Sequence, residues 1–286
     1  MQKGIITKTI GGFFFVGDED RNIIRTKIRG RIQKMVYPGD KVGFKDKIIE
    51  EVYPRENLLH RPKIANVDQV VLVLALSHPE FDRTLFDRFL VLLEAFNLDI
   101  VVAINKIDLA KKENINLPNL NDYNEAGYDI VYISAKKEKN IEKLYPFLKD
   151  KVSVLTGPSG VGKSTLINSL IENADMETRE VSKKLKRGVQ TTRHVELIPL
   201  KKGGWLADTP GFTSLDINKI KSEKLKYLFP EFNGYLAKCK FSTCSHTHEP
   251  GCALKKAVKD GEISKKRYES YKKFYNEIKE KEWVKW

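Results

Sequence analysis

Cysteine and long hydrophobic runs are both scarce in this sequence. Only 3 of its 286 residues are cysteine, which is too few for a disulfide scaffold and suits a reducing compartment. No apolar run approaches the roughly 18 to 20 residues that a membrane helix needs, and the apolar residues at 13–16 are too few for a secretory signal. We therefore expect a cytoplasmic protein that has no membrane partner and acts as a monomer.

Acidic residues are outnumbered by basic ones, and the excess is unevenly placed. The chain carries 51 Lys and Arg against 38 Asp and Glu, a net charge of +13. Residues 1–60 contribute +4 and residues 221–286 contribute +7, so the middle of the chain is nearly neutral. Basic flanks favour a polyanionic partner such as nucleic acid, although Lys-rich helices are often only solvated faces.

The first 58 residues contain five short apolar or alternating segments separated by turn residues. These segments are Ile5–Ile10, Phe13–Val16, Ile23–Ile28, Lys41–Phe44 and Ile48–Val52. Their spacing predicts a small β-barrel, and five strands in this length fit an OB-fold, a frequent RNA-binding platform. Basic residues at near-alternate positions would line one sheet face: Arg21, Arg25, Lys27, Arg29 and Arg31. The alternative is a purely structural barrel with a solvated face.

Residues 54–62 are bounded by prolines and are interpreted as a linker. After them, apolar strands alternate with amphipathic segments, a pattern typical of a parallel sheet covered by helices. The predicted strands are 68–76, 99–105, 129–134 and 152–155, the predicted helices are 82–96 and 141–148, and a hairpin is predicted at 195–200 and 205–207.

A phosphate-binding loop pattern follows the predicted strand at 152–155, and a segment of helical spacing follows the loop. The pattern comprises Gly157, Pro158, Ser159, Gly160, Val161, Gly162, Lys163, Ser164 and Thr165. Backbone N–H groups of such a loop cradle phosphate oxygens, helped by the helix N-terminus. Lys163 would reach the β- and γ-phosphates, and the Ser164 hydroxyl would coordinate Mg²⁺. The sequence therefore predicts a nucleoside triphosphate site.

Two motifs at the ends of neighbouring strands indicate guanine as the base. They comprise Asn105, Lys106, Ile107 and Asp108, and then Ser134, Ala135 and Lys136. Asp108 can accept hydrogen bonds from guanine N1 and N2, groups that adenine lacks, and an unpaired buried carboxylate is costly. Asn105 would brace the turn and the Lys106 stem would cover the ring. Backbone N–H groups of the second motif would support guanine O6.

Two further segments resemble nucleotide-state switches. Asp208 opens an Asp-Thr-Pro-Gly motif and would hold Mg²⁺ through water, while the Gly211 N–H would meet the γ-phosphate. Before it, one of two adjacent threonines should ligate Mg²⁺, and Thr192 is favoured over Thr191. The surrounding basic loop, residues 179–193, suits phosphate contacts, or it is a solvated loop that becomes ordered on binding.

All three cysteines lie within 14 residues of one another. Cys239, Cys244, His246 and Cys252 supply four ligands of the kind that structural Zn²⁺ prefers. Four protein ligands leave no open position for catalysis; the alternative is a set of buried free thiols. We expect the metal to replace a core that this small segment lacks. The helical stripe Tyr268, Tyr271, Phe274, Tyr275 and Ile278 that follows is interpreted as packing.

The motifs stand in an unusual order. In the TRAFAC class of GTPases the phosphate loop comes first, whereas here the motifs at 105–108 and 134–136 precede it and the motif at 208–211 comes last. This is the order of a circular permutation. With a barrel before it and a Cys/His cluster after it, the sequence closely resembles the ribosome small subunit-dependent GTPase A (RsgA) family over nearly its whole length.

The resemblance implies a circularly permuted α/β P-loop GTPase domain at 59–220. An OB-fold RNA-binding domain at 1–58 would precede it, and a small helical zinc-binding domain at 221–286 would follow. It also implies Mg²⁺-dependent hydrolysis of GTP to GDP in late maturation of the small ribosomal subunit. That subunit and its ribosomal RNA would be the partners, and the subunit would stimulate hydrolysis. The family pattern also favours His246 as the zinc ligand.

One position bears on catalysis and leaves other functions open. Ras-like enzymes place a water-orienting glutamine after this switch glycine, whereas this chain has Phe212, so the water must be positioned otherwise. We expect slow intrinsic hydrolysis that RNA accelerates. The alternatives are an RNA-binding chaperone whose GTP site is only regulatory, and a GTPase acting on transfer RNA or translation factors.

Overall fold

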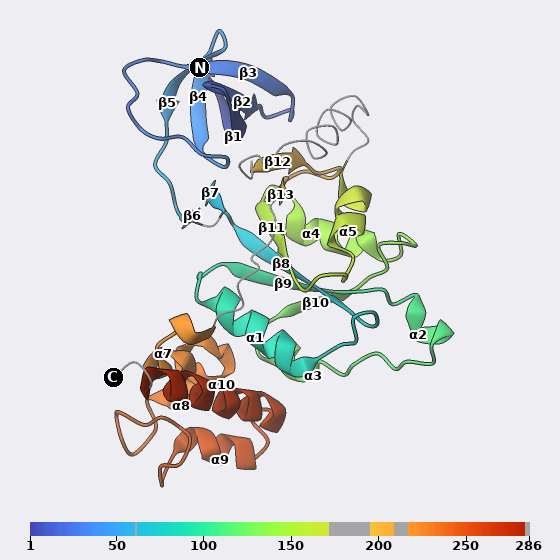
Figure 1. Ribbon diagram of the computed structural model, residues 1–286, viewed down its shortest axis with the longest axis vertical. Coiled ribbons are helices and arrows are strands. Elements are labelled where there is room, and N and C mark those ends of the chain that lie inside the picture. The colour runs from blue at the N-terminus through green and yellow to red at the C-terminus, as the bar shows by residue number, and fades with distance from the viewer. Residues whose placement is uncertain (61, 172–194, 209–216, 284–286) are drawn as a thin grey trace. The chain divides into compact units, whose positions relative to one another are not determined.

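The computed structural model describes residues 1–60, 62–171, 195–208 and 217–283 (Figure 1). The chain forms two compact units, each assembled from separate stretches. The first unit takes Met1–Val71, Ile133–Thr156 and Gly162–Thr213, and the second takes Leu72–Tyr132, Gly157–Val161 and Ser214–Trp286. The division into domains at 58 and 220 stays a prediction.

Five strands at the N-terminus form a closed barrel in the order β1-β2-β3-β5-β4, with β4 returning to pair with β1. The strands are β1 (Gln2–Ile10), β2 (Phe13–Gly17), β3 (Ile23–Ile28), β4 (Lys41–Lys45) and β5 (Ile48–Val52). Ile6, Val16 and Phe44 fill its core. Alternation of inward and outward residues brings these side chains together, and the predicted barrel is confirmed.

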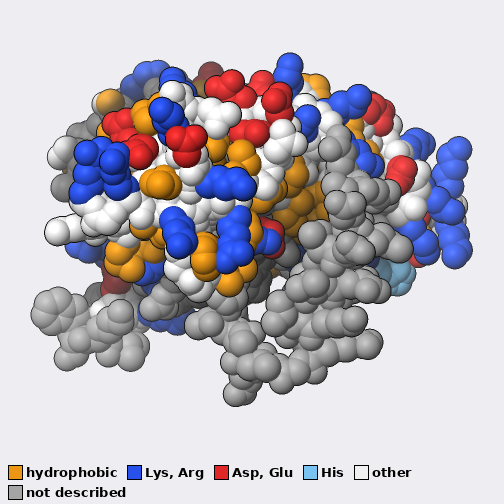
Figure 2. All heavy atoms as spheres, turned by 90° about the horizontal axis from the view of Figure 1, so that it is seen from above, with side chains coloured by type: hydrophobic (Ala, Val, Ile, Leu, Met, Phe, Trp, Pro, Cys, Tyr) orange, Lys and Arg blue, Asp and Glu red, His pale blue; other side chains and the backbone are white. Residues whose placement is uncertain are grey.

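Two of the five residues predicted for a basic face of the barrel, Arg25 and Lys27, lie on β3. Arg25 and Lys27 are exposed, with buried Thr26 between them. The Arg25 guanidinium lies 3.6 Å from the ring centre of Phe13 on β2, a cation–π contact. On the face seen from above, Lys and Arg side chains are interspersed with Asp, Glu and hydrophobic ones (Figure 2).

The interpretation of residues 54–62 as a linker is wrong. Strands β6 (Leu58–His60) and β7 (Lys63–Ala65) pair as an antiparallel two-stranded sheet. A side-chain amide takes the place of a further backbone pair, because Asn57 Nδ2 donates to the Val67 carbonyl at 2.8 Å and Asn57 Oδ1 accepts from the Val67 N–H at 3.0 Å. The prolines that bound residues 54–62 suggest a linker, and the sequence gives no sign that the Asn57 side chain pairs with the Val67 backbone.

A six-stranded sheet follows, in the order β10-β9-β8-β11-β13-β12. The strands are β8 (Gln69–Ala75), β9 (Asp99–Asn105), β10 (Asp129–Tyr132), β11 (Val152–Thr156), β12 (Glu196–Pro199) and β13 (Trp205–Asp208). β10 runs parallel to β9 and β11 parallel to β13, and β12 and β13 form the predicted hairpin. All seven residues of β8 are buried, as expected for a strand covered on both faces.

Short helices connect these strands, and α1 is the longest of them. They are α1 (Arg83–Glu94), α2 (Leu109–Lys112), α3 (Asn121–Glu125), η1 (Ile141–Leu144), α4 (Tyr145–Leu148) and α5 (Lys163–Leu170). Asp82 caps α1, because its carboxylate accepts from the N–H groups of Thr84 at 2.7 Å and Leu85 at 3.2 Å. In the described part of the chain, no helix is long and apolar enough to cross a membrane.

The C-terminal part is helical and has an aromatic core of its own. Its elements are η2 (Ile217–Lys219), α7 (Ser222–Leu225), η3 (Lys226–Leu228), η4 (Pro230–Phe232), α8 (Asn233–Leu236), α9 (Ala253–Lys259) and α10 (Lys265–Trp283). Phe229 and Phe232 stack at 4.9 Å, and Tyr271 meets both rings edge-on. The stripe on α10 is confirmed as packing, and the expectation that this segment lacks a core is wrong.

A fully buried arginine joins α10 to α1. Arg267 Nη1 lies 2.7 Å from Asp87 Oδ1, and Arg267 Nε lies 2.7 Å from Glu231 Oε1. Asp87 also accepts from the Tyr123 hydroxyl at 2.7 Å and from Ser270. A buried charge survives only when it is paired and hydrogen-bonded, so this network fixes the packing of α10 on α1.

Candidate nucleotide and metal sites

The phosphate loop, residues 157–165, has the backbone that its glycines allow. Gly157, Gly160 and Gly162 have φ of +137°, +80° and +95°, values that side-chain-bearing residues rarely adopt. At Gly157 a Cβ atom would lie 2.0 Å from the carbonyl oxygen of Val73 in β8. Only glycine fits there, and the chain can turn tightly from β11 into α5 to form an anion-binding loop.

Lys163, Ser164 and Thr165 make up the first turn of α5. Lys163 is half-buried, and burial lowers the pKa of its ammonium group. An anion beside it would favour the charged form, and bound phosphates would provide that environment. Ser164 and Thr165 are exposed, and their hydroxyls are therefore accessible to a ligand.

The base turn, residues 105–108, lies against the phosphate loop. Asn105 is buried, and its Nδ2 donates to the Val161 carbonyl at 2.8 Å. Lys106 Nζ donates to the Gly160 carbonyl at 2.7 Å. Two motifs separated by about fifty residues in sequence are thus joined by side chain-to-backbone hydrogen bonds. Their proximity is what a single nucleotide pocket requires.

The backbone of the base turn ends in the one-turn helix α2. Lys106 has φ of +65°, and its carbonyl accepts from the Leu109 N–H at 3.0 Å. Ile107 and Asp108 follow, half-buried. Asp108 stands at the start of α2, where its carboxylate is partly accessible to the solvent and to a base.

The second base motif forms a separate small turn. Ser134 and Lys139 exchange two backbone hydrogen bonds of 3.0 Å. Ser134 and Ala135 are buried and Lys136 is exposed. Strand β10 ends at Tyr132, two residues short of the predicted strand end, because this turn takes over the pairing.

The switch residues are only partly described. Asp208 is the last residue of β13. Thr191, Thr192, Gly211 and Phe212 lie outside the described residues, as does the basic loop at 179–193.

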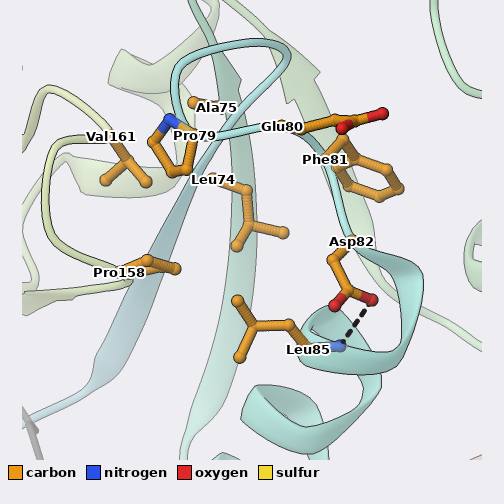
Figure 3. A pocket seen from close by; sticks show the side chains of 9 residues that line it. All are labelled: Leu74, Ala75, Pro79, Glu80, Phe81, Asp82, Leu85, Pro158 and Val161. Carbon is orange, nitrogen blue, oxygen red and sulfur yellow. Dashed lines mark hydrogen bonds between the residues drawn. The ribbon is translucent and has the colours of Figure 1, made fainter.

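An apolar recess beside the phosphate loop anchors it (Figure 3). Its lining comprises Leu74, Ala75, Pro79, Glu80, Phe81, Asp82, Leu85, Pro158 and Val161. In the close-up, Leu74 and Leu85 face the side of the recess formed by Pro158 and Val161, and Asp82 is turned to the N-terminus of α1. The lining is mostly hydrocarbon, so the recess is a packing surface for the loop rather than a phosphate site.

The four predicted metal ligands converge. Their ligand atoms all lie within 4.8 Å of one another. His246 Nδ1 is 3.4 Å from both Cys239 Sγ and Cys252 Sγ, and those two sulfurs are 3.8 Å apart. Zn–S bonds of about 2.3 Å and Zn–N bonds of about 2.0 Å at tetrahedral angles give edges of roughly 3.5 to 3.8 Å. The residues therefore fit a tetrahedral zinc ion, while His248 is exposed.

The chemistry of the four ligands also suits a cation. Burial raises the pKa of Cys244 to about 12, with Cys252 adding to the effect. A buried thiolate therefore needs a positive ion beside it. Among the described residues, the Nε2 atom of His246 is buried without a hydrogen-bond partner. Tyr268 holds the backbone of His246, because its hydroxyl donates to the His246 carbonyl at 2.8 Å.

Glu249 shapes the ligand loop between Cys244 and Cys252. Its carboxylate accepts from the backbone N–H groups of Ser245 at 2.6 Å and Thr247 at 3.2 Å. Burial favours the neutral acid, but hydrogen bonds from Ser245 and from the Glu249 backbone outweigh it and lower the pKa of Glu249 to about 2. The loop is thereby preformed around the position of the metal.

Comparisons with known proteins agree with this geometry. Residues 52–218 match the RsgA GTPase family. A protein of Clostridium kluyveri named small ribosomal subunit biogenesis GTPase RsgA is 45% identical, over 98% of this chain and 99% of its own. A protein of the same name from Clostridium botulinum is 43% identical, over 99% of this chain and 100% of its own. The chain belongs to the RsgA GTPase family.

Two solved structures are similar to this chain over nearly its whole length. The crystal structure of YloQ, described as a circularly permuted GTPase, matches with a TM-score of 0.79 and 38% identity, over 98% of this chain and 96% of that one. YjeQ from Thermotoga maritima matches with a TM-score of 0.79 and 38% identity, over 97% and 98%. The predicted fold class, a permuted P-loop GTPase preceded by an OB-like barrel, is confirmed.

Sequence reasoning missed one group of polar contacts beside the RsgA base turn. His78 Nε2 lies 3.1 Å from Glu113 Oε1. Ser77 Oγ donates to the other oxygen of Glu113 at 2.6 Å. These residues are 35 and 36 positions apart, and no local pattern in the sequence signals such a contact.

Proposed function

We propose that this chain is a Mg²⁺-dependent GTPase that binds the small ribosomal subunit and assists its late maturation, hydrolysing GTP to GDP and phosphate. Relatives that carry this function in their name span nearly its whole length. The observation that carries the proposal is the contact of Asn105 and Lys106 with the phosphate loop. This contact supports a single pocket formed by the base-recognition and phosphate-binding motifs.

Each motif of the pocket has its own task in this proposal. Backbone N–H groups of residues 157–165 cradle the phosphates and Lys163 neutralises the β- and γ-oxygens. Ser164 and Thr192 would hold Mg²⁺, with Asp208 acting through water. When bound, the ion would supply positive charge beside the phosphate oxygens. The Gly211 N–H meets the γ-phosphate.

Guanine selectivity is assigned to the base turn. The Asp108 carboxylate accepts from guanine N1 and N2, and the Lys106 stem covers the ring. The turn at Ser134, Ala135 and Lys136 supplies backbone N–H groups to guanine O6. A pocket that pairs these groups rejects adenine, because adenine leaves the carboxylate without partners.

The metal of the C-terminal part is proposed to be structural zinc. Cys239, Cys244, His246 and Cys252 would hold one ion and would leave no position for substrate. In this role zinc secures a surface loop on the aromatic core rather than taking part in hydrolysis.

The flanks of the chain are proposed to contact ribosomal RNA. Residues 1–60 and 221–286 hold most of the net charge, and Arg25 and Lys27 are exposed on the barrel. Such surfaces attract phosphate backbones. We place the protein in the cytoplasm, where ribosomes are assembled, and expect it to be a monomer.

Steady-state GTP turnover with and without purified small subunits tests the proposal. We expect slow turnover alone and at least about a tenfold increase with small subunits but not with large ones. The Ser164→Ala variant should lose the stimulated rate, because it lacks the Mg²⁺-ligating hydroxyl. Negligible turnover under all conditions would favour a GTP-regulated RNA chaperone. Stimulation by transfer RNA alone would favour action on translation factors.

A further inference from the structure

The segment after β8 lies between the base turn and the phosphate loop. Lys106 Nζ, which donates to the Gly160 carbonyl, also donates to the carbonyl of His78. A Cβ atom on Gly160 would be in van der Waals contact with Pro79, at 3.7 Å from its Cδ. One lysine therefore ties this segment to both parts of the pocket.

The same segment holds the other end of the base turn through a carboxylate. Asp108 precedes α2 and Glu113 follows it. Ser77 Oγ donates to Glu113 Oε2 at 2.6 Å, and His78 Nε2 lies 3.1 Å from Glu113 Oε1. Helix α2 has only four residues, so fixing Glu113 limits how far Asp108 can swing.

The burial and charge of this contact fix the orientation of the Glu113 carboxylate. Ser77 is buried, and its hydroxyl has the Glu113 carboxylate as an acceptor. This hydrogen bond, ahead of the smaller contribution of His78, lowers the pKa of Glu113. A short hydrogen bond to a charged acceptor is stronger than a neutral one. The carboxylate is therefore held at both oxygens.

We propose that Ser77 and Glu113 are positioning residues for base recognition, which hold α2 so that Asp108 meets both hydrogen-bond donors on the guanine edge. The inference rests on the proposed GTP-binding function and adds residues outside the recognised motifs. It concerns the geometry of Asp108 and not the phosphate contacts. Its signature is therefore a loss of base discrimination.

Competition binding of GDP and inosine diphosphate to the full-length protein tests this inference. Inosine lacks the exocyclic amino group, so Asp108 accepts one hydrogen bond from it instead of two. The wild type should prefer GDP by roughly 10-fold, the value of one charge-assisted hydrogen bond. In Glu113→Ala and Ser77→Ala this preference should fall to about 3-fold or less. The Ser77→Ala/Glu113→Ala double variant should lose no more than the larger single loss, because both residues act through one contact.

Controls separate positioning from general stability. Glu113→Gln keeps the size of the side chain and one acceptor, so its preference should lie between wild type and Glu113→Ala; if Glu113→Ala does not fold, Glu113→Gln and Ser77→Ala decide. Glu125→Gln, on an exposed residue of α3, should keep the full preference. The inference would be overturned if the Ser77 and Glu113 variants kept the wild-type preference for GDP, or if they bound both nucleotides more weakly by the same factor. Wild type that binds neither nucleotide would instead overturn the proposed function.

Discussion

At the scale of single residues, Asp108 carries the choice of base. Replacing it by Asn exchanges two acceptor oxygens for one acceptor and one donor. The amide fits the additional carbonyl of xanthine and leaves a guanine donor unmatched. We expect Asp108→Asn to weaken the binding of GDP by about 100-fold and to bind xanthosine diphosphate more tightly than GDP. Parallel titrations with both diphosphates measure this. A variant that still preferred GDP would exclude Asp108 as the base-reading group.

The pair of Arg88 and Glu277 gives a residue-level prediction of pH dependence. Arg88 Nη2 lies 2.5 Å from Glu277 Oε2, and the hydrogen bond from Arg88 lowers the pKa of that carboxyl. Because the folded pKa is below the unfolded value near 4.3, the pair stabilises the fold above that pH and ceases to do so as the pH falls through the folded pKa. In urea unfolding, the stability gap between wild type and Arg88→Ala should narrow below about pH 4. A gap that stays constant from pH 7 to pH 3 would contradict this.

At the scale of elements, α10 and α1 are joined by the buried Arg267. Replacing it by Met keeps the bulk but leaves the Asp87 and Glu231 carboxylates buried without their partner. We expect Arg267→Met to lower the free energy of unfolding by about 3–5 kcal/mol. Arg88→Ala, which breaks a partly exposed pair on the same two helices, is the matched control and should cost about 1 kcal/mol or less. Equal losses of unfolding free energy in the two variants would mean that the buried network contributes no more to stability than the partly exposed pair.

The aromatic core of the C-terminal helices sets what metal removal does. Phe229, Phe232 and Tyr271 contact one another directly, and Cys244 and Cys252 lie in the same buried cluster. We therefore expect chelation of zinc to release amide protection in residues 239–252 only, with α10 still protected in hydrogen exchange. Cys239→Ser should behave in the same way, and elemental analysis should find about one zinc per wild-type chain. Loss of protection along the whole of α10 would show that metal and core form one cooperative unit.

The sequence predicts most helices and strands of this chain but not the side-chain contacts that hold them together. Glycine spacing predicts the phosphate loop because φ values such as +137° at Gly157 leave little choice of residue. Ligand spacing predicts the zinc site for the same reason, since few residue types bind the metal. The amide closure by Asn57, the Arg267 network and the brace at Glu113 join residues far apart in the chain, and periodicity carries no signal for them. The wrong interpretation of residues 54–62 as a linker and the underestimated C-terminal core both follow from that.

At the scale of the whole molecule, the net charge of +13 predicts a strong effect of salt. Each phosphate contact with Lys or Arg releases condensed counterions, so affinity falls with salt concentration. We expect the concentration of small subunits needed for half-maximal GTPase stimulation to rise by at least about 10-fold between 50 and 200 mM KCl. The turnover at saturating subunits should change much less. If salt lowered the saturated rate and left the half-maximal concentration fixed, charge would be acting on hydrolysis and not on docking.

The strand order has a consequence for synthesis on the ribosome. β8 is buried along its whole length and neighbours both β9 and β11, yet β11 is translated 77 residues after β8 ends. Because translation adds about 5–20 residues per second, the edge of β8 that pairs with β11 in the folded sheet stays unpaired for roughly 4 to 15 seconds. A chain of this family therefore emerges during synthesis with one edge of its buried strand β8 exposed until β11 has followed.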